Sequence, residues 1–461
     1  MAIVGTFAVP HPPMIIPQVG RGSETQVEAT IRAYHRIAGE IAALKPETII
    51  ISSPHAVMYS DYFHISPGTH AAGSFARFGA AEVSFRETYD TELRETICSL
   101  AEERNQPAGT LGERDKTLDH GTMVPLYFIR QHYQEFRIIR IGLSGLPLTT
   151  HYEMGQVIRE AVQKIGRRAV YVASGDLSHK LQDYGPYGFA LEGPEYDERV
   201  MDVLGRAAFG ELLEFEEGFC EKAAECGHRS FVMMAGALDG DAVRPCRLSH
   251  EDVTGVGYGI CGFFPEGQDD SRRFLDRYLR KTQEELKKRR DAEDPYVRLA
   301  RTSLESYILN RQEIDIPDWV PNEMRSRTAG AFVSIHEHDR LRGCIGTILP
   351  VTGSLAREII QNAISASTRD PRFDPVKPAE LPWLQINVDV LGTPEPIDSP
   401  EQLDVKRYGV IVTKGRKRGL LLPDLDGVDS VEQQIRIAKQ KAGIRPEEPV
   451  SLERFEVVRH Y

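Results

Sequence analysis

Four histidines in the first 180 residues each lie where a predicted strand passes into a loop. Ligands of open α/β sheets gather beyond the carboxyl ends of the strands, so these positions favour contact with a metal or a substrate over packing. The four contexts are Val9-Pro10-His11-Pro12, Ser53-Pro54-His55-Ala56, Asp119-His120-Gly121 and Asp176-Leu177-Ser178-His179. Their repetition predicts one shared site.

His11 and His55 are the predicted metal ligands. Neutral imidazole is a common ligand of iron, copper and zinc, and two imidazoles with one carboxylate form the facial triad of non-haem Fe(II) enzymes. Each of the two histidines stands beside a proline, which restricts the backbone and so limits the ligand's movement.

The third ligand is expected near residue 225, where Glu225-Cys226-Gly227 precedes an apolar helix predicted at residues 231–238. Glu225 would suit Fe(II), whereas Cys226 would make a softer site that also suits copper or zinc. Glu225 could instead stabilise the positive end of the helix. The residues alone leave these alternatives open.

The elements that must position these side chains follow a strand–helix alternation. Ile- and Val-rich strands are predicted at residues 48–52, 137–141 and 169–173, with a first strand at 2–8 and helices at 25–43 and 151–165. Such strands are covered on both faces. We therefore expect an α/β domain whose mixed, mostly parallel sheet is flanked by helices.

A chain of 461 residues is too long for one hydrophobic core. The strand–helix alternation gives way to a charged segment, which is followed by a second globular pattern. We predict a metal-binding catalytic domain at residues 1–265, a charged helical linker at 266–293 and an α+β domain at 294–461. The linker is either a solvated bridge or a spacer for a partner. A helix at 297–309 and strands at 331–335, 384–391 and 409–412 are expected in the second domain.

Composition narrows the function classes. The net charge of -12 disfavours nucleic-acid binding, and no apolar run is long enough to cross a bilayer. The first residues do not form a signal peptide, and the six cysteines contain no CxxC pair. We expect a cytoplasmic protein with a small-molecule or protein partner, and the sequence leaves a homo-oligomer open.

The second domain has its own candidate chemistry in Leu341-Arg342-Gly343-Cys344-Ile345-Gly346 and in Asp370-Pro371-Arg372. Arg342 could lower the pKa of the Cys344 thiol and make it nucleophilic, although a small buried strand cysteine has the same appearance. The turn around Asp370 and Arg372 could bind an anion or form an ordinary salt-bridged loop.

The first 265 residues resemble the class III extradiol dioxygenases of the LigB superfamily and their relatives, the Memo proteins. The resemblance rests on His11-Pro12, Pro54-His55-Ala56, Asp119-His120-Gly121-Thr122 and Ser174-Gly175-Asp176-Leu177-Ser178-His179. It implies Fe(II) held by two histidines and a glutamate, with a catechol and O2 as substrates.

By this resemblance, His11 and His55 bind the metal, His179 is the catalytic acid and base, and His120 steadies the substrate. Asp176 orients His179, approaches the metal or stabilises a turn. Memo proteins have a cysteine followed by glycine where ring-cleaving members have glutamate. This chain offers both, Glu225 and Cys226, so the third ligand stays open.

The second half resembles the AMMECR family, most specifically in Leu341–Gly346. The motif implies a site around Arg342 and Cys344 that faces Asp370 and Arg372. The fusion is similar to the AmmeMemoRadiSam system, in which these domains accompany a radical S-adenosylmethionine enzyme. This chain lacks the cysteine triplet for such a cluster, so that partner would be separate.

Three functions follow as hypotheses. The first is an Fe(II)-dependent oxidoreductase of the extradiol type that acts on a dihydroxy-aromatic compound. The second is a metal-binding accessory protein of a radical enzyme, and the third is a peptide-binding module without catalysis.

Overall fold

The computed structural model describes residues 3–112, 116–337, 340–425 and 427–461. The chain divides into two compact units, Met1–Leu279 and Arg280–Tyr461. Within the described residues, no helix is both long enough and apolar enough to cross a membrane.

Unit 1 is built on a mixed, mostly parallel sheet. Its strand order is β7 (Arg137–Gly142), β2 (Thr48–Ser53), β8 (Ala169–Ser174), β1 (Ile3–Val9), β10 (Tyr258–Gln268) and β9 (Asp241–Glu251). The first four strands pair in parallel, and the hairpin of β9 and β10 adds antiparallel to β1. The predicted fold class and the four predicted strands are confirmed, except that Ala2 lies outside the described residues. The β9–β10 hairpin was not predicted.

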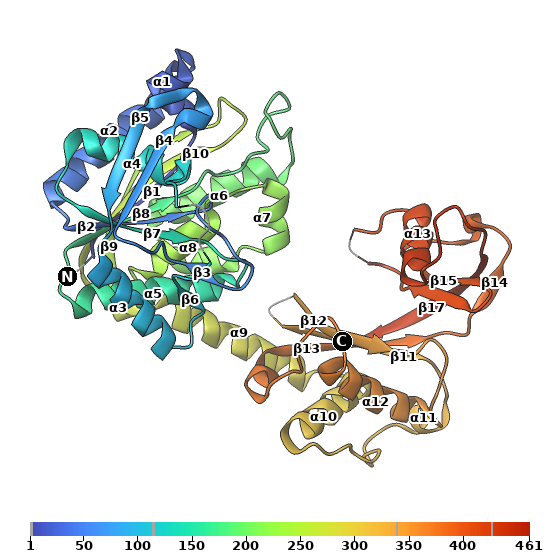
Figure 1. The fold of residues 1–461 in the computed structure, drawn as a ribbon. Helices are drawn as coiled ribbons and strands as arrows, with labels where there is room; N and C mark the ends of the chain where they lie inside the picture. The colour runs from blue at the N-terminus through green and yellow to red at the C-terminus, as the bar shows by residue number, and fades with distance from the viewer. Residues whose placement is uncertain (1–2, 113–115, 338–339, 426) are drawn as a thin grey trace. The chain divides into compact units, whose positions relative to one another are not determined.

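Helices cover both faces of this sheet (Figure 1). In β2, Ile49 and Ile51 pack on one side with α2 (Glu28–Leu44) and α4 (His120–His132). Ile50 faces the opposite layer, which contains α3 (Thr91–Glu103), α5 (Leu148–Lys164) and α8 (His228–Gly236). Because successive strand side chains point to opposite faces, a continuous apolar strand requires this double cover.

The predicted helices of unit 1 are confirmed with shifted ends. Residues 25–27 belong to the 3-10 turn η2 (Ser23–Val27), and the helix expected at 231–238 begins at His228. The remaining short elements and helices are η1 (Pro13–Ile15), α1 (Pro17–Gly20), β3 (Phe63–His64), β6 (Ala108–Gly109), α6 (Glu192–Arg206), η4 (Phe209–Glu214), α7 (Glu217–Ala223) and η5 (Asp270–Arg272).

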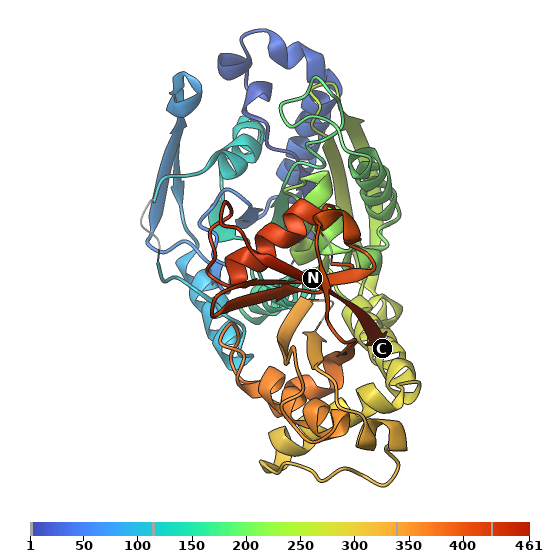
Figure 2. The ribbon, with the colours of Figure 1, turned by 90° about the vertical axis from the view of Figure 1, so that its right-hand side faces the viewer.

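A β-hairpin extends from the body of unit 1 (Figure 2). It consists of β4 (His70–Phe75) and β5 (Ala80–Thr88), joined by the turn η3 (Ala76–Phe78). The turn ends at Gly79, whose φ of +78° favours glycine. The hairpin brings Phe78 to the start of α4, where its ring contacts that of His120.

Helix α9 (Phe274–Asp291) contains the boundary between the units. Phe274 and Leu275 pack into the core of unit 1, and β10 extends to Gln268. The segment predicted as a linker, residues 266–293, therefore begins with residues that belong to unit 1. The cause is its apolar face, which completes the unit 1 core instead of remaining in solvent.

Unit 2 is an α+β structure, as predicted. Its antiparallel sheet has the order β12 (Arg340–Gly346), β11 (Ala331–Glu337), β13 (Leu384–Leu391), β17 (Ser451–His460), β15 (Tyr408–Lys414) and β16 (Lys417–Leu421), and β14 (Glu395–Ile397) pairs with β17. The other elements are α10 (Pro295–Asn310), α11 (Asn322–Ser326), α12 (Leu355–Thr368), η6 (Pro378–Trp383), η7 (Pro400–Gln402) and α13 (Val431–Lys441).

The cores of unit 2 follow from these elements. Helices α10 and α12 pack on the sheet through Leu304, Ile359 and Val333, among others. Helix α13 packs on β15 and β16 through Ala438. The predicted helix at 297–309 and the three predicted strands are confirmed within a few residues.

Candidate metal centre

The strands of unit 1 bring His11 and His55 together. His11 follows the end of β1 and His55 the end of β2, and both strands pair in parallel with β8. Their carboxyl ends therefore meet at one edge of the sheet. The Nε2 atoms of the two histidines lie 2.9 Å apart.

Hydrogen bonds fix which nitrogen His11 presents. Its Nδ1 lies 3.0 Å from the Ser174 hydroxyl, which donates to the Gly121 carbonyl at 2.6 Å. Since that hydroxyl proton is engaged, the Ser174 oxygen accepts from Nδ1–H of His11, and Nε2 keeps its lone pair. Burial, helped by nearby His55, holds the pKa of His11 well below its usual value and keeps the ring neutral.

Cys226 is the third member of this group. Its Sγ lies 3.6 Å from Nε2 of His11 and accepts a hydrogen bond of 3.2 Å from the Asp176 backbone amide. The ligand atoms of His11, His55 and Cys226 all lie within 4.8 Å of one another. Burial, with the nearby carboxylates, raises the pKa of the thiol well above its usual value. A bound cation would reverse this effect and stabilise the thiolate.

Glu225 has a different task from its neighbour. Its Oε2 accepts a hydrogen bond of 2.6 Å from the His228 amide, the first of helix α8. The carboxylate thus stabilises the helix N-terminus. Burial raises the pKa of Glu225 to about 7. Glu225 belongs to neither of the ligand groups found among the described residues.

Asp176 and His179 form a second group with the same cysteine. Ligand atoms of Asp176, His179 and Cys226 also lie within 4.8 Å of one another. Asp176 Oδ1 accepts a 2.7 Å hydrogen bond from the His11 amide. His179 Nδ1 is buried and has no hydrogen-bond partner in the part of the chain that the structure describes.

Two glycines make this arrangement possible. A Cβ added to Gly175 would lie 2.0 Å from Cα of Gly227, so the loops that carry Asp176 and Cys226 touch backbone to backbone. Sequence reasoning missed this contact and the role of Ser174. The sequence could have indicated the contact, because Gly175 directly precedes Asp176 and Gly227 directly follows Cys226.

His120 lies beside the ligand pair. Its ring centroid is 3.9 Å from that of His55 and 5.4 Å from that of His11. Burial, with the two imidazoles, lowers the pKa of His120 to about 3. Asp119 fixes the start of α4 by accepting from the Thr122 amide at 3.0 Å. His120 is therefore a neutral imidazole held against the centre.

Two exposed aromatic rings contact His120 and His179. Phe78 contacts His120 at 5.4 Å between centroids, and Tyr187 contacts His179 at 5.1 Å. Phe78 is 38% exposed and Tyr187 is 60% exposed. These rings are available to line the approach to the centre.

The donors fit a transition-metal ion. Metal–imidazole bonds of about 2.0–2.1 Å place two adjacent nitrogen ligands about 3 Å apart, which the 2.9 Å between His11 and His55 matches. Two neutral imidazoles and one thiol are typical ligands of iron, copper and zinc. This His/Cys/Asp cluster can hold a metal ion, and the donors do not specify which one.

Comparisons with known proteins agree with this architecture. Residues 5–261 match the family described as the catalytic LigB subunit of aromatic ring-opening dioxygenase. The chain belongs to the LigB family. Residues 297–460 match the AMMECR1 family, so a LigB domain precedes an AMMECR1 domain, as the resemblances predicted.

One relative covers the whole chain, and others cover about a third of it. Protein CA_C1420 of Clostridium acetobutylicum is 41% identical and spans 100% of this chain and 99% of its own. A Thermotoga maritima protein is 53% identical over 36% of this chain and 98% of its own. The crystal structure of PH0010 from Pyrococcus horikoshii is 34% identical, with a TM-score of 0.34, over 36% of this chain and 88% of its own.

In the AMMECR1 domain, three of the four predicted site residues come together. The Cys344 amide donates to Asp370 Oδ2 at 2.9 Å, and Arg372 donates from Nε to Asp370 Oδ1 at 2.9 Å. Arg372 also donates to the Cys344 carbonyl at 3.2 Å. The Ser334 hydroxyl donates to the Cys344 sulfur at 3.2 Å.

Arg342 does not act on the thiol. Its guanidinium donates to Glu380 at 3.1 and 3.2 Å and to the Asp374 carbonyl at 2.8 Å. Of the two interpretations of Cys344, the structure favours the strand cysteine over the activated thiol, because burial raises its pKa and the opposing guanidinium is that of Arg372.

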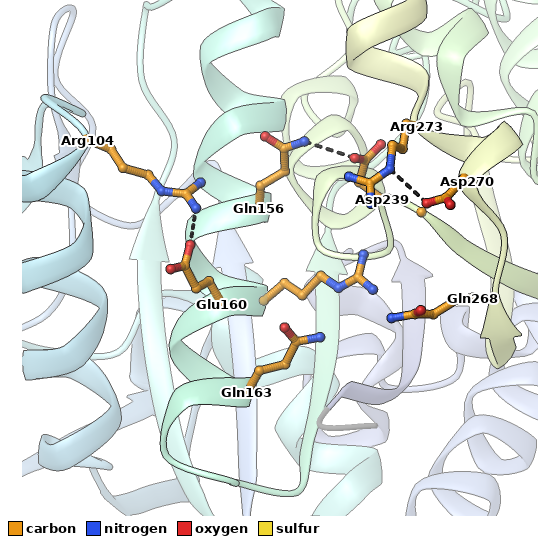
Figure 3. Close-up of a pocket in the computed structure, with 10 residues that line it drawn as sticks. Arg104, Gln156, Glu160, Gln163, Asp239, Gln268, Asp270 and Arg273 are labelled. Carbon is orange, nitrogen blue, oxygen red and sulfur yellow. Dashed lines mark hydrogen bonds and ion pairs between the residues drawn. The ribbon is translucent and has the colours of Figure 1, made fainter.

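The LigB domain also has a polar cavity of about 460 Å³ away from the candidate metal centre (Figure 3). Gln268, at the end of β10, lines it, and β10 runs antiparallel to β1. The cavity therefore lies at the opposite end of the sheet from His11. Its arginines are paired: Arg104 with Glu160, Arg159 with Asp241 and Arg273 with Asp270.

Proposed function

We propose that this protein is an Fe(II)-dependent oxidoreductase of the extradiol type, which acts on a catechol-like dihydroxy-aromatic substrate with O2. The 2.9 Å approach of the His11 and His55 Nε2 atoms carries this proposal. Membership of a family described by aromatic ring opening supports it.

His11, His55 and Cys226 would hold the ion, and Glu225 would cap helix α8 instead of binding metal. Fe(II) held by these three side chains would supply a site at which a catechol and O2 could both bind. The bond from His11 to Ser174 keeps the ligand nitrogen unprotonated and its ring oriented.

The other imidazoles would handle the substrate and its protons. His120 is neutral and lies 3.9 Å from the His55 ring, so it can donate to or accept from an oxygen bound beside that ligand. His179, with its free buried Nδ1, would take a proton from a substrate hydroxyl and return it. Phe78 and Tyr187 would pack against the aromatic ring.

Anaerobic iron loading followed by O2 uptake with a panel of catechols tests this proposal. We expect the wild type to bind iron and to consume O2 only with a catechol. His11→Ala and Cys226→Ala should lose the iron, whereas Glu225→Gln, which keeps the helix cap, should retain it. Unchanged iron content in both His11→Ala and His55→Ala would contradict the site assignment.

One observation favours a second candidate function. A cysteine, not a glutamate, accompanies the histidines, and a thiol makes a softer site that also suits copper or zinc. The chain would then be a metal-binding accessory protein of a separate radical S-adenosylmethionine enzyme. Metal binding without O2 uptake on any catechol, together with binding to such an enzyme, would favour this role.

A further inference from the structure

We propose that Asp176, His179 and Cys226 form a second cation site, which shares the Cys226 sulfur with the site of His11 and His55. The proposal rests on the proposed function in so far as the first site must hold a metal. Both ligand groups have all their donor atoms within 4.8 Å of one another. A thiolate sulfur has enough lone pairs to bind two cations.

Two side chains of the second group, His179 and Asp176, are buried with few hydrogen bonds. His179 Nδ1 is buried without a hydrogen-bond partner among the described residues. Asp176 is 6% exposed, and its carboxylate accepts one backbone hydrogen bond, from His11. A buried carboxylate of this kind is costly unless a cation or a proton compensates it.

The backbone holds these donors in place before any ion binds. The Asp176 amide donates to the Cys226 sulfur at 3.2 Å, and the Cys226 amide donates to the Asp176 carbonyl at 3.4 Å. The His179 amide donates to the Ala223 carbonyl at 3.2 Å. The contact of Gly175 with Gly227 locks the same two loops together. Preorganised donors favour binding because little flexibility is lost.

Charge sets the order in which the two sites fill. A first divalent ion is balanced by the Cys226 thiolate and the Asp176 carboxylate. A second divalent ion adds two uncompensated positive charges and shares a sulfur that is already bound. The second site should therefore bind more weakly, and its O, N and S donors suit zinc or a similar thiophilic divalent ion.

Occupation of the second site would change the chemistry of the first. A His179 nitrogen that binds a cation cannot accept a proton, so its acid–base role would be blocked. Excess zinc would thus inhibit an enzyme that the first ion activates.

Metal titration of the full chain tests the proposal without relying on turnover. The reduced, metal-free protein is titrated anaerobically with Zn(II), and bound metal is counted after gel filtration. We expect two zinc ions per chain, the second at least tenfold weaker. Asp176→Asn and His179→Gln should each bind one ion, and the matched control Glu225→Gln should bind two.

Cobalt reports whether the sulfur is shared. Two Co(II) ions on one sulfur couple magnetically, so the electron paramagnetic resonance signal should rise with the first equivalent and fall with the second. Saturation of the wild type at one ion, or two ions in both Asp176→Asn and His179→Gln, would overturn the proposal. If the wild type binds one ion and His11→Ala binds none, only the second site is overturned. If the wild type binds no ion, the proposed function is overturned as well.

Discussion

Gly175 and Gly227 meet so closely that a methyl group on Gly175 would lie 2.0 Å from the Cα of Gly227. Gly175 precedes Asp176 and Gly227 follows Cys226, so the contact sets the distance between two candidate ligands. Neither glycine has a positive φ. Close approach, and not backbone conformation, therefore explains why both positions are glycine.

We predict that Gly175→Ala destabilises the LigB domain by about 1–3 kcal/mol, because two backbones must separate to admit the methyl group. Its metal content should fall, since Asp176 and Cys226 move apart. Far-UV circular dichroism during urea unfolding and metal analysis measure the two effects.

The matched control is Gly218→Ala in helix α7, where an added Cβ meets no atom within 4 Å. This variant should keep its metal and its stability, because alanine also has the higher helix propensity. Equal losses in both variants would show that the Gly175 contact has no special role.

Ser174→Ala should weaken metal binding by about 10- to 100-fold, because the His11 ring loses the acceptor that fixes its tautomer and orientation. Ser52→Ala is the control, since Ser52 is an equally buried serine whose hydroxyl lies 2.6 Å from the Ser230 hydroxyl. Competition with a fluorescent chelator measures both affinities. An unchanged affinity in Ser174→Ala would remove this hydroxyl from the site.

Phe78→Ala and Tyr187→Ala should each raise the KM for a catechol about fivefold, equivalent to a ring–ring contact of roughly 1 kcal/mol. Iron content should not change, because neither ring belongs to a ligand group. Tyr184→Ala is the control from the same loop, and Tyr184 is 72% exposed. Steady-state O2 uptake gives KM, and a change confined to kcat would contradict a role in substrate packing.

The sequence predicted the parts of the site that depend on local pattern. Buried strands and proline-flanked histidines identified His11 and His55, because parallel strands end at one edge of a sheet. The choice between Glu225 and Cys226 could not be predicted. It depends on the left-handed Ala224, with φ of +53°, and on a helix that begins at His228, whose amide donates to Glu225.

The same reasoning explains why Arg342 does not act on Cys344. Arg342 and Cys344 lie two residues apart in β12 and so share a face of the strand, which favoured their interaction. The partner that captures Arg342 is Glu380, 38 residues away, and only the tertiary structure reveals that pairing. Arg372 lies next to Cys344 because the buried Asp370 holds its guanidinium, and Asp370 is 26 residues from Cys344 in the sequence.

Asp370 provides a pH-dependent prediction for the AMMECR1 domain. The Arg372 guanidinium, assisted by the Cys344 amide, holds the pKa of this carboxyl well below its usual value. A carboxyl with a lowered folded pKa stabilises the fold above its unfolded pKa, near 4, and this contribution disappears as the pH falls toward the folded pKa.

We therefore expect Asp370→Asn to destabilise the domain by about 2 kcal/mol at pH 7, where charged hydrogen bonds to the backbone are lost. The Arg372 side chain is 53% exposed, so solvent screening limits its share. Urea unfolding of the full chain, followed by tryptophan fluorescence, reports this domain selectively, because both tryptophans, Trp319 and Trp383, lie in it. The difference between wild type and variant should shrink below pH 4, whereas the exposed Asp318→Asn should match the wild type throughout. If the difference in unfolding free energy stays constant down to pH 2.5, Asp370 stabilises the domain through its shape and not through its charge.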